Sequence, residues 1–287
     1  MRRPTTRPKM NSQNDKEYLN SLNTWRADRE KGLRREYGWL SLAGLFWLKD
    51  GENQFGSAVE NPVRLPARFP KSAGIFTMKE GHVNVNPSEG VAIRFNNEHL
   101  KSTSQTIQVD TSGQPDYLFI DDLRLGVIER AGRLAIRIWD PQNPVRLNFV
   151  GCSWFEPAPE LRVTANIETY PEPKHVMVDD IVGIQRPATM QAALAFELDG
   201  KTQRLDAELQ EDGSYDIIFK DATAGKSTFP GGRYLTSEVS EGDHVVIDFN
   251  IAYNPPCAFT DFATCPLPLP QNLLTVEIEA GEKYQQG

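Results

Sequence analysis

The strongest constraint on the fold of this chain is an alternation of apolar and polar residues around two Asp-Gly pairs. From residue 194 to residue 220, apolar residues recur at every second position in three runs separated by Asp199-Gly200 and Asp212-Gly213. A period of two places the apolar side chains on one face of a strand, and Asp-Gly suits a type I′ turn, in which both central residues have positive φ. The pattern predicts a three-stranded antiparallel meander with one apolar face.

The same kind of signal occurs in the first half of the chain. Ala131-Gly132 lies inside the alternating stretch 125–139, and Glu80-Gly81 separates two short apolar runs. After Gly38, most apolar runs are short and are cut by Gly, Pro, Asn or Asp, as is typical of strands. We therefore expect a mainly β protein, with one N-terminal helix followed by two β-sandwich or barrel-like units.

The helix and the unit boundary follow from local patterns. Tyr18, Leu22 and Trp25 are spaced by four and three residues, as on one face of a helix. The stretch 156–160, which reads Glu-Pro-Ala-Pro-Glu, disfavours both helix and central strand. The expected organisation is a disordered leader over 1–14, a helix over 15–37, a first β unit over 38–158, and a second β unit with a Pro-rich C-terminal segment over 159–287.

Charge and hydropathy restrict the partners. The formal net charge is −8, and because residues 1–10 hold four basic and no acidic residues, the rest carries 27 basic and 39 acidic residues, a charge of −12. An acidic body repels phosphate backbones, so we expect no nucleic-acid partner. The longest apolar stretch, 39–48, is far shorter than the roughly 20 residues that span a bilayer, and no secretory signal is evident. We expect a soluble, cytoplasmic protein without a membrane partner, and the oligomeric state stays open.

Common catalytic and metal-binding motifs are missing from the sequence. It contains no Gly-x-Ser-x-Gly elbow, phosphate-binding Walker loop, dinucleotide fingerprint or His-Glu-x-x-His motif. Cys257 and Cys265 lie eight positions apart, without the Cys-x-x-Cys spacing of a structural zinc site. We therefore expect no cofactor and no metal. For the two cysteines, buried thiols are the first interpretation, a disulfide the second and a reactive nucleophile the third.

Hydrogen-bonding side chains are concentrated in the Gly- and Pro-rich region between residues 221 and 272. They are Asp221, Thr223, Arg233, Asp248, Asn250, Asn254, Thr260 and Asn272. Irregular backbone leaves N–H and C=O groups without partners, and side chains of these types satisfy them. The same groups can instead line a pocket that orients a ligand. Both interpretations stay open at this point.

The functional hypothesis is a metal-free pocket in the second β unit for a small polar or anionic molecule. Its expected ligand-binding residues are Arg233, Asp248, Asn250, Tyr253 and Asn254. A buried carboxylate needs a cation, and the planar guanidinium of Arg233 makes it the best candidate partner for Asp248. Whether the protein is an enzyme stays open. If it is one, hydrolysis or isomerisation is expected, with Asp248 or Asp221 as general base and Arg233 as anion stabiliser.

The alternative is a protein–protein interaction or scaffolding module without catalysis. All five tryptophans fall between residues 25 and 154. Large aromatic residues usually build cores, whereas an exposed aromatic patch marks a protein partner. Shielded tryptophans would argue against this alternative.

Two motifs carry a resemblance to a known family. The first begins with Gly38-Trp39-Leu40-Ser41-Leu42. The second, which is long and more specific, begins with Asp221-Ala222-Thr223, includes Ala252-Tyr253-Asn254-Pro255-Pro256-Cys257 and Cys265-Pro266-Leu267-Pro268, and ends with Ala280-Gly281-Glu282-Lys283. Together they resemble an uncharacterised prokaryotic family, domain-of-unknown-function family 1684, over roughly residues 20–284. The resemblance implies a folded β protein without a cofactor and no assigned reaction, and it points to the C-terminal segment.

A weaker similarity lies in the first β unit. Phe55-Gly56-Ser57 and the stretches 61–66 and 74–83 are similar to the opening strands of forkhead-associated domains, which are β-sandwiches that bind phosphothreonine. In that family Arg follows the Gly, and a Ser-x-x-His motif comes later. Here Ser57 follows Gly56, and no His occupies the matching place. The similarity therefore supports a β-sandwich but not phosphopeptide binding.

Overall fold

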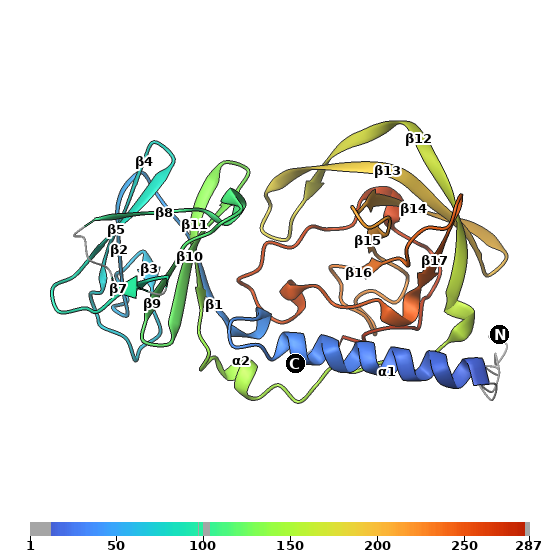
Figure 1. Ribbon diagram of the computed structural model, residues 1–287, viewed down its shortest axis with the longest axis horizontal. Helices are drawn as coiled ribbons and strands as arrows, with labels where there is room; N and C mark the ends of the chain where they lie inside the picture. The colour runs from blue at the N-terminus through green and yellow to red at the C-terminus, as the bar shows by residue number, and fades with distance from the viewer. Residues whose placement is uncertain (1–12, 97, 100–103, 285–287) are drawn as a thin grey trace. The chain divides into compact units, whose positions relative to one another are not determined.

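A computed structural model describes residues 13–96, 98–99 and 104–284 and shows a mainly β protein with one long helix (Figure 1). The chain forms two compact units. The sandwich unit comprises residues 33–149 and 259–263, and the half-barrel unit comprises residues 13–32, 150–258 and 264–284. The expected fold class, a helix followed by β units, is confirmed.

In the sandwich unit, two sheets share one apolar core. The six-stranded sheet has the order β1 (Leu42–Trp47), β11 (Arg133–Trp139), β10 (Leu123–Arg130), β9 (Tyr117–Ile120), β6 (Arg94–Phe95) and β7 (Glu98–His99). The five-stranded sheet has the order β3 (Val63–Arg64), β2 (Gly51–Gly56), β4 (Gly74–Lys79), β5 (His82–Pro87) and β8 (Gln105–Ile107). Phe55 and Phe76 stack in this core with ring centroids 4.4 Å apart, and Leu125 and Ile136 come from the other sheet. A short helix, α2 (Pro144–Leu147), follows β11.

In the half-barrel unit, a single antiparallel sheet carries the helix and the C-terminal segment. Its strand order is β16 (Arg233–Thr236), β15 (Tyr215–Phe219), β14 (Lys201–Leu209), β13 (Gln185–Leu198), β12 (Arg162–Asp179) and β17 (His244–Asp248). One face buries an apolar core that includes Leu194, Leu205, Ile217 and Ile247. Because side chains alternate along a strand, neighbours of these residues point to the opposite face.

The predicted meander is confirmed as β13, β14 and β15, but only one of its two turns has the expected form. Asp199 and Gly200 both have positive φ, 52° and 70°, as a type I′ turn requires. In the second turn only Gly213 of the Asp-Gly pair has positive φ, 86°, so the type I′ prediction is wrong there. The physical reason is loop length, because residues 210–214 separate β14 from β15 and Gly213 alone takes the left-handed position.

The two other predicted hairpin turns are confirmed. Glu80 and Gly81, between β4 and β5, have φ of 51° and 76°. Ala131 and Gly132, between β10 and β11, have φ of 49° and 73°. In each case both central residues take the left-handed conformation, as a two-residue hairpin loop with right-handed strand twist favours.

The observed unit boundary lies between Phe149 and Val150, upstream of the Pro-rich stretch at 156–160. That stretch belongs with the half-barrel unit, because the two residues just before it are bonded to the C-terminal segment of that unit. Trp154 forms a β-bridge with Glu282, and the backbone N–H of Phe155 donates to the C=O of Gly281 at 2.9 Å. The expected leader over 1–14 lies outside the described residues except for residues 13 and 14, which begin the helix.

Helix α1 (Gln13–Leu33) packs on the half-barrel unit by one stripe, as its spacing predicts, but it ends at Leu33 rather than at residue 37, because residues 34–38 form turns and bends. Leu22 is 2% exposed, and the ring of Trp25 meets that of Trp154 edge to face at 5.8 Å. Arg29 donates from Nη2 to the C=O of Asn254 at 2.8 Å. Within the described residues, no helix has the length and apolar character needed to cross a membrane.

Candidate functional site

A cavity of about 270 Å³ lies on the face of the half-barrel sheet opposite its apolar core. The strands β14, β15 and β16 supply its floor, since Asp206, Asp216 and Tyr234 alternate with core residues of those strands. Its full lining is Val178, Arg186, Met190, Asp206, Glu208, Asp216, Ile217, Ile218, Tyr234, Leu235, Tyr253, Pro266, Leu267, Leu269 and Asn272.

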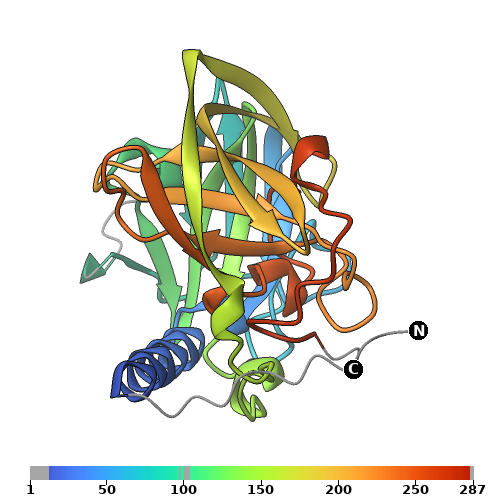
Figure 2. The same ribbon diagram turned by 90° about the vertical axis from the view of Figure 1, so that its right-hand side faces the viewer.

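The cavity exists because the β12–β13 hairpin leaves the sheet. Strand β13 pairs with β14 only from Ala192 to Leu198, whereas residues 185–190 pair with β12 alone. This distal part of the hairpin curves over β14, β15 and β16 (Figures 1 and 2). The C-terminal segment bonds to the hairpin's end, where the N–H of Ile181 donates to Cys265 and the N–H of Leu267 donates to Asp179, each to a backbone C=O.

The polar lining is predominantly acidic. Asp206 is 6% exposed and accepts hydrogen bonds from the hydroxyl of Tyr170 at 2.6 Å and from Nε2 of Gln271 at 2.9 Å. Glu208 and Asp216 are exposed. Arg186 is the one cationic side chain among the described residues of the lining. The lining therefore holds three carboxylates and one guanidinium, and Lys174 pairs with one of these carboxylates, Asp206, at 3.6 Å.

Two tyrosines and an apolar cluster complete the walls. The rings of Tyr234 and Tyr253 meet edge to face at 6.0 Å, and the hydroxyl of Tyr234 donates to the C=O of Pro266 at 2.9 Å. Burial raises the pKa of both tyrosines, so both rings stay neutral at physiological pH. The opposite wall is an apolar cluster that includes Met190 and Leu269.

Arg233 does not line this cavity and does not pair with Asp248 as expected. It is 1% exposed and pairs with Asp221 at 3.4 Å, and it also donates to the backbone C=O groups of Ile278 and Ala280. The expectation is wrong because of topology. Strand β15 pairs with β16, which begins at Arg233, and Asp221 lies just after the end of β15. Asp248 is instead the last residue of β17, which pairs with β12.

Asp221 is the centre of a closed network. Its carboxylate accepts from the N–H of Ile278 at 2.6 Å and from the hydroxyl of Thr223 at 2.8 and 2.9 Å. Thr223 in turn meets the hydroxyl of Thr228 at 2.8 Å. Together with Arg233, this network binds the C-terminal segment to the sheet.

The remaining predicted residues divide between the cavity and internal bonds. Tyr253 lines the cavity. Asn250 accepts from the N–H of Ala158 at 2.7 Å and donates to its C=O at 2.8 Å, and its side chain and N–H both donate to Asp248. Asn254 donates to the backbone C=O of Lys283 at 2.9 Å. The scaffolding interpretation therefore describes these two asparagines.

Asp248 also anchors α1, which leads to a pH-dependent prediction. The hydroxyl of Tyr18 donates to Oδ2 of Asp248 at 2.8 Å, and burial together with this carboxylate raises the pKa of Tyr18. A group whose pKa is higher in the native state contributes stability below its unfolded pKa, about 10 for Tyr, and loses that contribution as pH rises further.

We expect Tyr18→Phe to lower the free energy of unfolding by about 2 kcal/mol at pH 7, the typical contribution of a hydrogen bond to a charged group. Urea denaturation at pH 7 and at alkaline pH measures this, and the difference from the wild type should shrink above pH of about 10. A difference that stays constant across that range would contradict this role of Tyr18.

The cavity residues Arg186, Asp206, Glu208, Asp216 and Tyr234 are absent from the sequence-based site. One signal was available in the strand patterns. Ile217 and Ile218 are consecutive, so one of the two must lie on the face opposite the core. Apolar and aromatic residues on that face indicate that something covers it.

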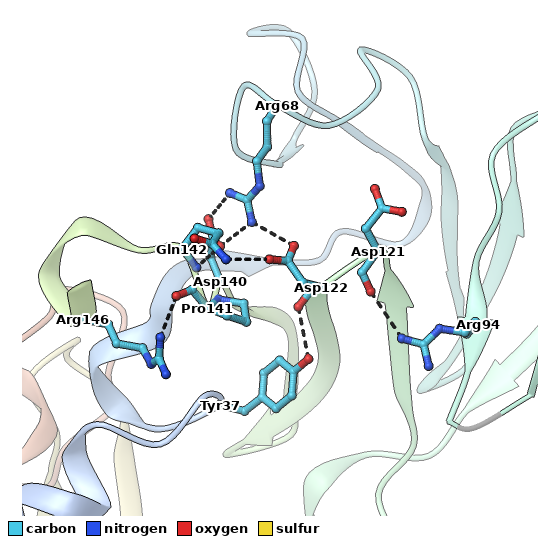
Figure 3. Close-up of polar contacts among 9 residues, drawn as sticks. All are labelled: Tyr37, Arg68, Arg94, Asp121, Asp122, Asp140, Pro141, Gln142 and Arg146. Atoms are coloured by element: carbon cyan, nitrogen blue, oxygen red, sulfur yellow. Dashed lines mark hydrogen bonds and ion pairs between the residues drawn. The ribbon is translucent and has the colours of Figure 1, made fainter.

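A second polar cluster lies on loops of the sandwich unit, outside the region between residues 221 and 272 that the sequence indicates as the site. Figure 3 shows Arg68 between Asp140 and Asp122, and its two terminal guanidinium nitrogens, Nη1 and Nη2, each donate to one carboxylate oxygen of Asp140 at 2.5 Å. One of these nitrogens also donates to Asp122 at 3.1 Å, and Gln142 donates to the other oxygen of Asp122 at 3.2 Å. Two-point pairing satisfies the guanidinium, so this cluster joins three loops rather than offering a charge to a ligand.

Comparisons with known proteins give a family but no activity. Residues 147–283 match the model of a family described as "Protein of unknown function (DUF1684)". The solution NMR structure of an uncharacterised protein from gene locus rrnAC0354 of Haloarcula marismortui is similar at 34% sequence identity, with a TM-score of 0.41. That similarity covers 48% of this chain and 78% of the other. No curated protein matches the chain.

Proposed function

The chain belongs, through residues 147–283, to a family of proteins of unknown function (DUF1684), and we propose that this part binds a small, positively charged molecule in the half-barrel cavity. The observation that carries the proposal is the lining's charge. Asp206, Glu208 and Asp216 outnumber Arg186 and the Lys174 that pairs with Asp206, and a cleft lined mainly by charges of one sign attracts the opposite sign. Without Arg233 in the lining, the anionic ligand expected from the sequence is disfavoured.

The neutral parts of the cavity fit the same class of ligand. Arg29 already lies over the ring of Tyr253 at 4.6 Å, so the ring of Tyr234 is the one that can receive an ammonium group by cation–π attraction. The apolar wall at Met190 and Leu269 can bury a short hydrocarbon chain. A volume of about 270 Å³ is near the lower end for ligand pockets, so the proposed ligand is small.

Ligand binding is favoured over metal-free hydrolysis because the candidate catalytic side chains are buried and already hydrogen-bonded. Asp221, Arg233 and Asp248 are at most 6% exposed, and each is hydrogen-bonded to protein groups. A general base has to reach the proton it abstracts, directly or through one water molecule. None of these three side chains is among the residues that line the cavity.

The tryptophans give the interaction module little support. Trp39 is 37% exposed, and the other four are half-buried. Arginine side chains lie over the rings of three of them, Trp47, Trp139 and Trp154. Such contacts shield the aromatic faces that a partner would use.

The test uses n-pentylamine as the cationic probe and pentanoate as the anionic probe of matched size. We expect pentylamine to raise the Tm of the wild type in a concentration-dependent way and pentanoate to have little effect. Removing two charges with Glu208→Gln/Asp216→Asn should weaken pentylamine binding by about tenfold, taking up to 1 kcal/mol for each exposed charge.

The matched control is Glu197→Gln/Glu211→Gln, which removes two exposed carboxylates that do not line the cavity. This control should keep the pentylamine response of the wild type. Stabilisation by pentanoate, or an equal loss of response in both double variants, would contradict the proposal.

A further inference from the structure

Two of the three cysteines meet beside the cavity wall. The backbone N–H of Cys257 donates to Sγ of Cys265 at 3.3 Å, which places the two cysteines next to each other. Among the described residues neither cysteine is in a disulfide, and Cys265 is buried while Cys257 is half-buried. The third cysteine, Cys152, lies elsewhere, with its backbone N–H bonded to Glu30 and its thiol next to Glu282.

We propose that Cys257 and Cys265 are a redox-active pair that closes reversibly to an intramolecular disulfide. When Sγ of one cysteine lies against the backbone N–H of the other, little movement is needed to bring the two sulfur atoms to bonding distance, whereas cysteines far apart cannot be bridged. The proposal concerns a modification site and does not depend on the ligand of the cavity.

The position of the pair in the chain gives the bond a structural consequence. Cys257 is among the last residues before the chain leaves the half-barrel unit at Ala258, and Cys265 directly follows Thr264, where it returns. A disulfide would join these two points. Pro266, the next residue, lines the cavity and accepts the hydrogen bond of Tyr234, so one end of the bond is continuous with the cavity wall.

A low-molecular-weight disulfide such as oxidised glutathione is the oxidant. Cys257, the more accessible thiol, loses its proton to solvent and attacks one sulfur of glutathione disulfide, which forms a mixed disulfide and releases one glutathione. Cys265 then loses its proton to solvent and attacks the sulfur of Cys257, which releases the second glutathione, and each released glutathione thiolate takes up a proton. Two protein thiols are thereby oxidised to one disulfide, while one glutathione disulfide is reduced to two thiols.

The surroundings of Cys257 affect the rate of disulfide formation. Hydrogen bonding to Cys265 and burial raise the pKa of Cys257. Because the thiolate is the attacking species, disulfide formation should be slow at neutral pH. As long as the pH is below that pKa, the rate should increase about tenfold for each unit by which the pH is raised.

The test counts thiols with Ellman's reagent after the full-length protein is treated with oxidised glutathione, quenched with acid and denatured. The expected count falls from three to one, and dithiothreitol restores it to three. Peptide mapping should place the bond between Cys257 and Cys265. In the Cys152→Ser variant the count should fall from two to none.

Three results would overturn the proposal. They are a count that stays at three, a mixed disulfide that persists on Cys257, and a bond that involves Cys152 or a second copy of the chain. The variant Cys265→Ser serves as the matched control. It should retain its glutathione adduct on Cys257, because the resolving thiol is missing.

Discussion

Replacing Arg233 with Ala is expected to lower the free energy of unfolding by about 3–5 kcal/mol, because it leaves the carboxylate of Asp221 buried without its cation. Both side chains are 1% exposed, so water cannot replace the lost partner. The variant also loses the hydrogen bonds that hold the C=O groups of Ile278 and Ala280. Urea denaturation followed by circular dichroism gives the free energy.

An exposed pair on the same sheet supplies the control. Arg204 binds Glu168 through two hydrogen bonds, of 2.9 and 3.0 Å, with both side chains about half exposed. Arg204→Ala should have a much smaller effect, since solvent screens this pair. A further check is Arg233→Met/Asp221→Leu, which should be more stable than Arg233→Met alone. A loss of stability in Arg233→Ala no larger than in Arg204→Ala would contradict the account.

Asn272→Ala is expected to lower the free energy of unfolding by about 3 kcal/mol, roughly 1 kcal/mol for each buried backbone group left without its hydrogen bond. The side chain of Asn272 accepts from the N–H of Asp206 at 2.8 Å and donates to the C=O groups of Asp206 and Ile218, each at 2.9 Å. Because it also lines the cavity, the variant should lose the response to pentylamine. Thermal unfolding with and without pentylamine measures both effects.

Asn166→Ala provides the comparison for Asn272. Asn166 lies on β12 with an exposed side chain, so its replacement should change stability by less than about 0.5 kcal/mol. Equal stability of the Asn272 and Asn166 variants would show that the C-terminal segment is not held to the sheet in this way.

The hairpins could be predicted from sequence because their determinants are local. An apolar–polar alternation with a period of two, interrupted by a pair of turn residues, specifies a hairpin within about twenty residues. The hairpins β10–β11 and β13–β14 follow this rule. The Asp212-Gly213 turn shows the limit of that argument. Its loop length, rather than its Asp-Gly pair, selects the conformation.

The site could not be predicted because it depends on contacts between distant segments. The sequence shows that Arg233 needs a carboxylate, but strand order decides between Asp221 and Asp248. It likewise indicates that the polar residues of 221–272 satisfy irregular backbone, as Asn250 and Asn254 do. The cavity itself arises where the β12–β13 hairpin departs from β14, and no local pattern records that divergence.

The location of bound pentylamine shows whether the half-barrel cavity is the binding site. In a crystal structure of the protein with pentylamine, we expect the ammonium group near Asp216 or Glu208, with the alkyl chain against Met190 and Leu269. Density for the amine elsewhere, such as beside the Arg68–Asp140 cluster of the sandwich unit, together with an empty half-barrel cavity, would contradict the account.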